Sequence, residues 1–394
     1  MAIASELSLR IEERLLARTA LFQPFFAREA PRLAEACREL SERFLQGGRL
    51  LAFGRGPYAT DAQHVAVEFV HPVIVGKRAL PALDLSPLFG PWLDAVVRPE
   101  DAVMGFGPPG GDPEVQAALR AAAARGAMTF ALPGSEGSYA VDAATADPFA
   151  HQELLELLYH VLWETVHVFF EHRELGRDVG PAAFLYPFLG RGEGRSSNLP
   201  SEVAASILMK VEDAAALRLR VAREVAEQIG DAILTLDERL ARGGQLVLFG
   251  NGGSATDAND WAIDSVAPPP GFRPLSAISL GLDSATVTAI ANDVGTEVVF
   301  LRQLIAHARP ADVAVAISTS GSSRNIVAAL TEARRRGLAT VALLGYDGGE
   351  IKQQGLADCC IVVRSDHIPR IQEVHASVYH IIRECLEELG RGRD

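Results

Sequence analysis

The pattern of apolar and polar positions repeats in the two halves of the chain. Each half begins with amphipathic helices, predicted over 5–46 and 201–242 from apolar residues at helical spacing. A short apolar run then predicts a strand, at 49–53 and at 245–249, before a glycine-rich turn and a further helix. Strands and helices continue to alternate, so we expect each half to form a parallel sheet covered by helices on both faces.

The glycine-rich turns indicate that the halves are copies of one domain. GGRLLAFGRGPYATDAQH at 47–64 aligns with GGQLVLFGNGGSATDAND at 243–260, 196 positions later. This period is longer than that of solenoid repeats and indicates a duplicated domain. The expected fold is therefore α/β, with two tandem αβα sandwiches of flavodoxin-like or Rossmann-like type.

Long helical stretches, at 151–175 and 370–390, close the two halves. Between the halves the chain is rich in Gly, Pro and Ser, as in GRDVGPAAFLYPFLGRGEGRSSNLP, which is typical of a linker. We therefore predict an N-terminal domain at 1–178, a linker at 179–200 and a C-terminal domain at 201–394.

Charge and composition exclude several classes of partner. The 394-residue chain has a net charge of −13, which disfavours nucleic acid and anionic membrane surfaces. No apolar run reaches the roughly 18 residues that a membrane helix needs. The four cysteines lack zinc-site spacing and disulfide density, so we expect reduced thiols in a cytoplasmic protein.

The second glycine turn has the features of an anion site. A predicted strand leads into Gly250, Asn251, Gly252 and Gly253, and a helix starts near Ser254. Free amides at a helix start, with the positive end of its dipole, attract phosphate. The spacing matches neither a dinucleotide fingerprint nor a nucleotide P-loop, so no nucleotide cofactor is expected. A tight turn without ligand remains the alternative for this motif alone.

A second motif favours phosphate. ISTSGSSRNIV places Ser318, Thr319, Ser320 and Ser323 between a buried strand and a helix. Simple helix caps also use hydroxyl groups, but four within six residues, beside a second glycine turn, exceed what capping needs. We therefore expect a phosphate site.

GNGGSATDA, ISTSGSSRNIVAAL and RIQEVHASVYH, in this order, resemble the sugar-isomerase (SIS) domain, and within it the sedoheptulose 7-phosphate isomerase (phosphoheptose isomerase) family. The resemblance covers nearly the whole second half, but in the first half only the glycine turn and two helices. It implies phosphate binding by Ser254, Ser318, Thr319, Ser320 and Ser323, with Asn251 and Asp283 facing the sugar.

The resemblance also implies four acid/base and zinc-binding positions in each half. They fall on His64, Glu68, Gln152 and His160 in the first half, and on Asp260, Asp264, Gln372 and His380 in the second. Residues four apart share a helix face, which suits two zinc ligands or an acid/base pair. An isolated pair of this kind is otherwise an ordinary surface pair. The first half keeps the family's residues here, whereas aspartates replace His and Glu in the second.

The phosphate motifs show the opposite pattern. Arg55, Pro57 and Tyr58 replace the Asn, Gly and Ser of the second turn, and GFGPPGGDPEV stands where ISTSGSSRNIV stands later. We therefore predict composite sites, in which the second half binds phosphate and the first supplies Glu68 and His160. The resemblance further implies a homodimer that mimics a tetramer of SIS domains.

The expected activity is aldose–ketose isomerisation of a phosphorylated sugar, by resemblance sedoheptulose 7-phosphate to a heptose 7-phosphate. Glu68 would act as base, His160 would move protons between oxygens as an enediol forms, and zinc would bind at the quartet. One alternative is a non-catalytic phosphosugar-binding or assembly protein, which Asp260 and Asp264 favour. Another is catalysis confined to the second half, with Asp264 and His380 as the pair.

Overall fold

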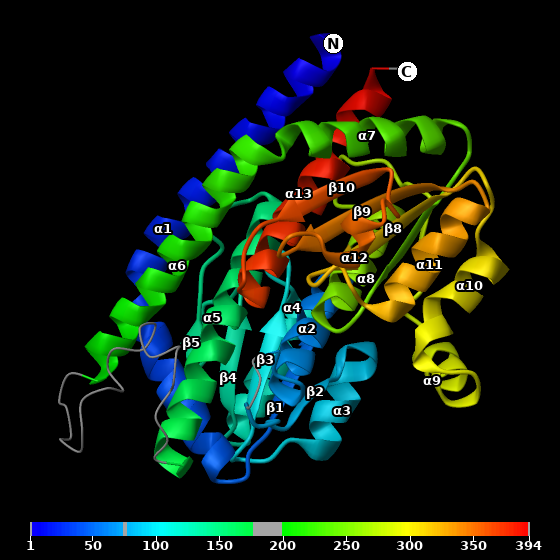
Figure 1. Cartoon of the computed structure of the whole chain (residues 1–394). Coiled ribbons are helices and arrows are strands. Elements are labelled where there is room, and N and C mark those ends of the chain that lie inside the picture. The colour runs from blue at the N-terminus through cyan, green and yellow to red at the C-terminus, as the bar shows by residue number, and fades with distance from the viewer. Residues whose placement is uncertain (1, 74–76, 176–198, 393–394) are drawn as a thin grey trace. The chain divides into compact units, whose positions relative to one another are not determined.

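Two five-stranded parallel sheets organise the chain (Figure 1). The computed structural model describes residues 2–73, 77–175 and 199–392. The predicted linker lies almost wholly outside these ranges. Both sheets are parallel throughout and carry helices, as the alternating pattern predicted.

The first sheet has the strand order β2-β1-β3-β4-β5. Its strands are β1 (Leu50–Gly54), β2 (Ala82–Asp84), β3 (Ala102–Phe106), β4 (Met128–Leu132) and β5 (Tyr139–Ala140). The helices of this half are α1 (Ala2–Leu45), α2 (Tyr58–Val70), the 3-10 helix η1 (Ser86–Leu88), α3 (Phe89–Val96), α4 (Pro113–Ala124) and α5 (Pro148–Leu175).

The second sheet has the corresponding order β10-β9-β8-β6-β7. Its strands are β6 (Leu246–Gly250), β7 (Ala277–Ser279), β8 (Val313–Ser318), β9 (Ala339–Gly345) and β10 (Cys359–Val363). The helices of this half are α6 (Leu199–Glu224), α7 (Ala226–Ala241), α8 (Gly253–Val266), α9 (Ser284–Asp293), η4 (Thr296–Val298), α10 (Val299–His307), α11 (Arg324–Arg335), α12 (Gly349–Gln353) and α13 (Ile368–Arg391).

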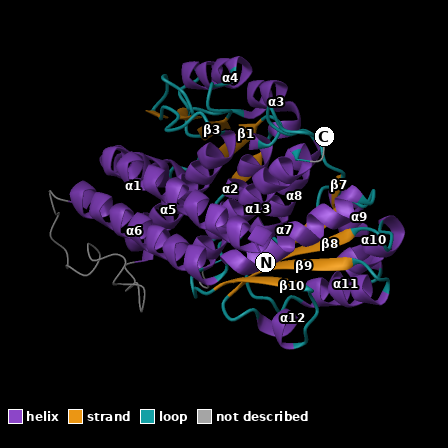
Figure 2. Cartoon of the chain, turned by 90° about the horizontal axis from the view of Figure 1, so that it is seen from above, coloured by secondary structure: helices purple, strands orange, loops and turns teal. Residues whose placement is uncertain are grey.

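Alternate residues of the second sheet pack into two different cores. Leu246 and Leu248 point to the side covered by α7, α8 and α13, whereas Val247 and Phe249 point to the side of α10 and α11. Figure 2 shows α7 and α13 on one side of β8, β9 and β10, and α11 and α12 on the other. The alternation follows from the two-residue period of a strand.

The first sheet is covered in the same way. Leu50 and Ala52 join the core formed with α1, α2 and α5, whereas Leu51 and Phe53 join the smaller core under α3 and α4. Because every residue of β1 and β3 is buried, these strands consist of continuous apolar runs rather than alternating ones.

The compact units differ from the predicted domains, because the start of α1 belongs to the unit of the second half and the first part of α6 belongs to the unit of the first half. One unit is Arg18–Ala216, and the other combines Met1–Ala17 with Leu217–Asp394. The start of α1 therefore packs with the second half, through Leu7, Ile11 and Leu15. The start of α6 packs with the first half, through Val203, Ile207 and Val211. An amphipathic pattern predicts that these faces are buried, but does not identify the core that buries them.

The helical region predicted as 201–242 consists of two helices, α6 and α7, with the break at Val225. None of the described helices combines the length and apolar character needed to cross a bilayer.

Candidate functional site

The glycine turn and the serine loop follow two adjacent strands of the second sheet. β6 lies between β7 and β8 in the sheet. After β6 the chain adds β7 on one side of it, and then crosses over to add β8 on the other side. The carboxyl ends of β6 and β8 therefore form the topological switch point, where open α/β sheets bind their ligands. Gly250–Gly253 leaves β6 and Ser318–Ser323 leaves β8, so the fold brings the two predicted phosphate motifs to one edge.

Glycine is required in the turn that precedes α8. A Cβ on Gly250 would collide with the carbonyl oxygen of Ser254, and Gly252 has a φ of +56°. Because α8 begins at Gly253, the amides of Gly253 and Ser254 have no partner among the described residues and remain available to an anion, whereas the Ala255 amide already donates to the Gly252 carbonyl.

Three of the predicted phosphate-binding hydroxyls make no hydrogen bond within the described part of the chain. Ser254 is buried, with 4% of its surface exposed, and Thr319 is half-buried. Ser323 is the N-cap residue of α11, yet its side chain does not cap the helix. These hydroxyls can donate to a phosphate without giving up an existing bond.

The other two serines shape the loop. The hydroxyl oxygen of Ser318 accepts from the Gly321 amide at 3.2 Å, and that of Ser320 accepts from the Ser322 amide at 3.3 Å. Each hydroxyl proton is still free to point toward a ligand, so these residues can hold the loop and bind phosphate together.

Asn251 and Asp283, both exposed and expected to face the sugar, already have local partners. The side-chain amides of Asn251 and Asn325 exchange hydrogen bonds of 2.8 and 3.0 Å, joining the glycine turn to α11. Asp283 caps α9 by accepting from the amides of Ala285 and Thr286. The hydrogen bond from the Thr286 hydroxyl is the main cause of the lowered pKa of Asp283.

The corresponding position in the first half is acidic. Asp112 caps α4, and the Arg55 guanidinium lies 2.9 Å from Glu114 and 3.5 Å from Asp112. Two carboxylates therefore stand near the helix start where the second half presents hydroxyls, and they neutralise the arginine. This charge arrangement disfavours phosphate.

The first-half quartet lies on α2 and α5 and is buried. The Nε2 atoms of His64 and His160 are 3.3 Å apart, and Glu68 Oε1 lies 3.8 Å from His64 Nε2. No more than 2% of the surface of any of the three residues is exposed. In a tetrahedral site with Zn–N bonds of about 2.0–2.1 Å, two ligand atoms lie about 3.3–3.4 Å apart. The separation of the two imidazoles fits this geometry.

Gln152, the fourth member, is buried and oriented by α2. Its side-chain amide donates to Asp61 at 3.1 Å and is 3.5 Å from the Thr60 hydroxyl. His64, Glu68 and His160 form one of the groups whose atoms lie close enough to hold a metal ion together. Two imidazoles and a carboxylate are a ligand set that zinc accepts.

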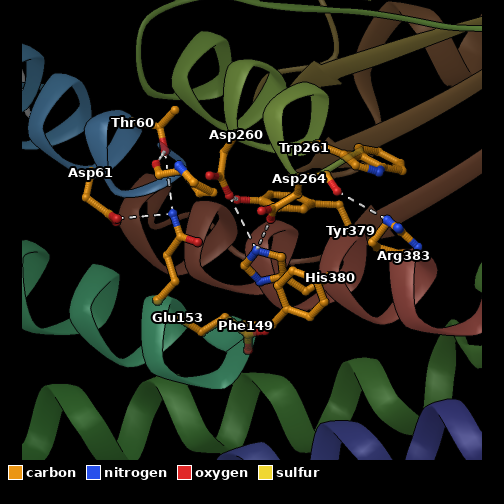
Figure 3. A network of polar contacts seen from close by, with 12 residues as sticks. Thr60, Asp61, Phe149, Glu153, Asp260, Trp261, Asp264, Tyr379, His380 and Arg383 are labelled. Carbon is orange, nitrogen blue, oxygen red and sulfur yellow. Dashed lines mark hydrogen bonds and ion pairs between the residues drawn. The ribbon is translucent and has the colours of Figure 1, made fainter. Parts of the chain in front are cut away.

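The second-half quartet forms a different cluster, on α8 and α13. His380 Nε2 is 3.4 Å from an oxygen of Asp260 and 3.4 Å from an oxygen of Asp264 (Figure 3). The Tyr379 hydroxyl donates to Asp260 at 2.8 Å. Gln372 is also buried. This cluster can also hold a metal ion, but two of its three ligands are oxygens.

Burial, reinforced by the neighbouring charge of Asp260, raises the pKa of Asp264 to about 7. His380 opposes the effect through its hydrogen bond and charge.

Comparisons with known proteins identify the family. The chain is 45% identical to the phosphoheptose isomerase of Solidesulfovibrio magneticus over 178 residues, which are 45% of this chain and 86% of that protein. It is 43% identical to the phosphoheptose isomerase of Helicobacter pylori over 162 residues, or 41% and 83% of the two chains. The SIS domain family model matches residues 211–345. The chain belongs to the phosphoheptose isomerase family of SIS-domain enzymes.

A solved structure extends the likeness in fold to both halves. The C-terminal domain of glucosamine-fructose-6-phosphate aminotransferase from Francisella tularensis matches with a TM-score of 0.59 at 12% identity. The match covers 95% of this chain and 96% of that one. The predicted SIS fold is thus confirmed, together with the predicted family.

Several residues of the site were missed by sequence reasoning. They orient other side chains: Asn325 pairs with Asn251, Tyr379 binds Asp260, and Asp61 binds Gln152. The only sequence signal was their place beside predicted residues, since Tyr379 precedes His380 and Asn325 lies two positions after Ser323.

We expect the raised pKa of Asp264 to make the metal-free protein less stable as the pH rises. The folded state binds this proton more tightly than the unfolded chain, so stability from Asp264 is fully present below about pH 4 and lost as the pH rises through 7. Asp264→Asn should therefore stabilise the chelated protein by roughly 2–4 kcal/mol more at pH 8 than at pH 5. Urea unfolding at the two pH values measures this difference.

Asp283→Asn is the matched control, because its exposed carboxylate has a lowered pKa and is ionised at both pH values. It should shift stability equally at pH 5 and pH 8. An Asp264→Asn effect that is also equal at the two pH values would contradict the prediction.

Proposed function

We propose that the protein is an aldose–ketose isomerase of a phosphorylated sugar, converting sedoheptulose 7-phosphate to D-glycero-D-manno-heptose 7-phosphate or acting on a close relative of that substrate. The observation that carries the proposal is the group of three unpaired hydroxyls at the switch point, on Ser254, Thr319 and Ser323. They lie beside the free amides of α8, in a chain of the phosphoheptose isomerase family.

The phosphate would bind in the second half. Hydroxyls of the serine loop and amides at the start of α8 all donate hydrogen bonds, and the dipole of the helix adds a positive field. Phosphate binding of this kind fixes one end of the sugar and uses no group that has to change its charge. The reacting carbons are then placed by the rest of the site.

The chemistry would consist of proton transfers. A carboxylate removes the proton from the carbon next to the carbonyl, and an imidazole moves protons between the two oxygens as the enediol forms and collapses. We assign these roles to Glu68 and His160. Burial of both residues excludes water that would otherwise compete for the protons.

His64, Glu68, Gln152 and His160 would hold zinc, in agreement with the 3.3 Å separation of the two imidazole nitrogens. Bound there, zinc would polarise the carbonyl of the sugar. Gln152 is positioned for this role by Asp61, which accepts a hydrogen bond from its amide.

Solvent-proton exchange tests the proposal directly. Sedoheptulose 7-phosphate incubated with the zinc-loaded protein in deuterated water should exchange the protons on the carbons next to the carbonyl. An aldose anomeric signal should then appear in the proton NMR spectrum. Exchange is the sharper readout, because it reports enediol formation even where equilibrium limits net conversion. Absence of both signals would overturn the proposal for this substrate.

A phosphosugar-binding protein without catalysis is the second candidate. The observation that favours it is the second-half cluster, where the Tyr379 hydroxyl and His380 both engage Asp260. A carboxylate held in this way is a poor base. Saturable binding of sedoheptulose 7-phosphate, combined with no proton exchange, would identify this function.

A further inference from the structure

A separate pocket of about 770 Å³ lies at the carboxyl ends of β8, β9 and β10, within the C-terminal unit. Its volume is within the usual range of small-molecule sites. The residues that line it are almost all polar or charged, although carbon atoms make up the larger part of the lining surface, and they come from the serine loop, the turn after β9 and the segment after β10. The lining includes Ser320, Ser322, Tyr346, Gln353, Arg364 and Asp366.

Close packing joins this pocket to the phosphate loop. A Cβ on Gly321 would collide with the Gly348 carbonyl, and one on Gly349 would collide with the Ser320 carbonyl. The Ile351 amide donates to the Gly321 carbonyl at 2.9 Å. The backbones of the serine loop and of the turn after β9 are therefore in direct contact, with no side chain between them.

Two side chains in the pocket can donate hydrogen bonds but have no partner among the described residues. Neither Arg364, which is exposed, nor Gln353 has a hydrogen-bond or ion-pair partner among the described residues. Tyr346 has a φ of +49° and is the only residue other than glycine with positive φ in the described ranges. Such a conformation costs of order 1–3 kcal/mol and clusters at functional sites. Here it directs an aromatic side chain into the lining of the pocket.

The charges select the class of ligand. Arg364 offers a planar set of donors that matches a phosphate, and it also lines a neighbouring pocket of about 350 Å³ that contains Lys352. Asp347 and Asp366 supply carboxylates that accept hydrogen bonds from hydroxyl groups. A ligand with one phosphate and several hydroxyls satisfies both requirements, whereas a second anionic group would meet these carboxylates.

We propose that this pocket is a second, regulatory site for a small phosphorylated polyol, which borders the phosphate site at Ser320 and binds its ligand through Arg364. A ligand bound to Arg364 and Ser322 would fix the turn after β9 and, through Gly321 and Gly349, the serine loop that holds the substrate phosphate. The proposal rests on the proposed function only in naming the loop as the coupled element.

Calorimetric titration with sedoheptulose 7-phosphate tests the binding. The substrate site is first weakened by Ser254→Ala with Ser323→Ala, which leaves every residue of the pocket unchanged. This double variant should still bind the probe. Adding Arg364→Gln should weaken the remaining affinity by about 10- to 100-fold, the usual effect of losing a charged hydrogen-bonded pair.

Arg302→Gln is the matched control, because Arg302 is another exposed arginine without a partner among the described residues and does not line the pocket. Added to the same double variant, it should leave the affinity unchanged. Equal affinity in the Arg364→Gln and Arg302→Gln backgrounds would overturn the proposal, as would no binding to the double variant. A failed isomerase assay with wild-type protein would instead overturn the proposed function.

Hydrogen exchange tests the coupling. In the double variant, the probe should slow amide exchange over 318–323 and 346–351, and Arg364→Gln should abolish the slowing in both segments. Slowing confined to 346–351 would show that the pocket binds the polyol without acting on the serine loop, and would overturn the regulatory part of the proposal.

Discussion

Replacing Glu68 by glutamine is expected to lower kcat for sedoheptulose 7-phosphate by about 10²- to 10⁴-fold, the usual contribution of a general base. Glutamine keeps the size of the side chain but cannot accept the proton. Because the phosphate motifs lie in the other half of the sequence, KM should change little. Because Glu68 is also a predicted zinc ligand, elemental analysis must show that the variant keeps its zinc, and steady-state kinetics then measures both constants.

Asp264→Asn is the matched comparison, since Asp264 occupies the corresponding position of the second half. If the first half supplies the base, this change should lower kcat by less than about tenfold. The opposite ranking, with Asp264→Asn the more severe, would place catalysis in the second half. Glu68→Asp should restore part of the lost turnover, because it returns a carboxylate on a shorter side chain, and its failure to do so would indicate a structural role for Glu68.

Much of the fold could be predicted because its signals are local. The runs DAVMGF, AMTFAL and DVAVAIS are short, apolar and bounded by turn residues, and each contains a strand in the structure. Because the domain is duplicated, the pattern of strand, glycine turn and helix occurs twice in the sequence, and each copy supports the prediction made from the other. β1 and β6 begin one residue later than predicted, which is within the usual error at the end of a strand.

The partners of the long helices could not be predicted for a physical reason. Leu7, Ile11 and Leu15 form an apolar face that any core could cover. They belong to one core with residues more than 200 positions away, such as Leu217 and Val221. Helical periodicity predicts that a face is buried, but the choice of core depends on three-dimensional packing.

The candidate site shows the same limit. Motif spacing indicated the serine loop and both quartets, but not which hydroxyls shape the loop and which remain free. That distinction depends on backbone amides such as that of Gly321, which donates a hydrogen bond to the Ser318 hydroxyl. Likewise, nothing in the spacing of Asp260 and Asp264 predicts that Tyr379 donates a hydrogen bond to one of them.

The two clusters differ in ways that predict different affinities for zinc. The first offers two imidazoles and a glutamate, whereas the second offers one imidazole and two aspartates. Zinc accepts nitrogen ligands readily, and oxygen-rich sets suit harder cations such as magnesium and manganese. We therefore expect the first cluster to retain zinc through purification and gel filtration more firmly than the second.

Replacing His64 and His160 together by alanine is expected to abolish this zinc content. The change removes both nitrogen ligands, whose Nε2 atoms lie 3.3 Å apart, and leaves Glu68 and Gln152 as the predicted members of the quartet. Elemental analysis of protein purified in zinc-replete medium should fall from about one zinc per chain to background.

Asp260→Ala with His380→Ala is the paired control for this experiment. It removes the same number of ligands from the second cluster and should leave the tightly held zinc in place. Both double variants create buried cavities, so circular dichroism must show that each remains folded. A folded His64→Ala, His160→Ala variant that keeps its zinc would contradict the assignment. Loss of zinc only from the control variant would show that the zinc site consists of Asp260, Asp264 and His380.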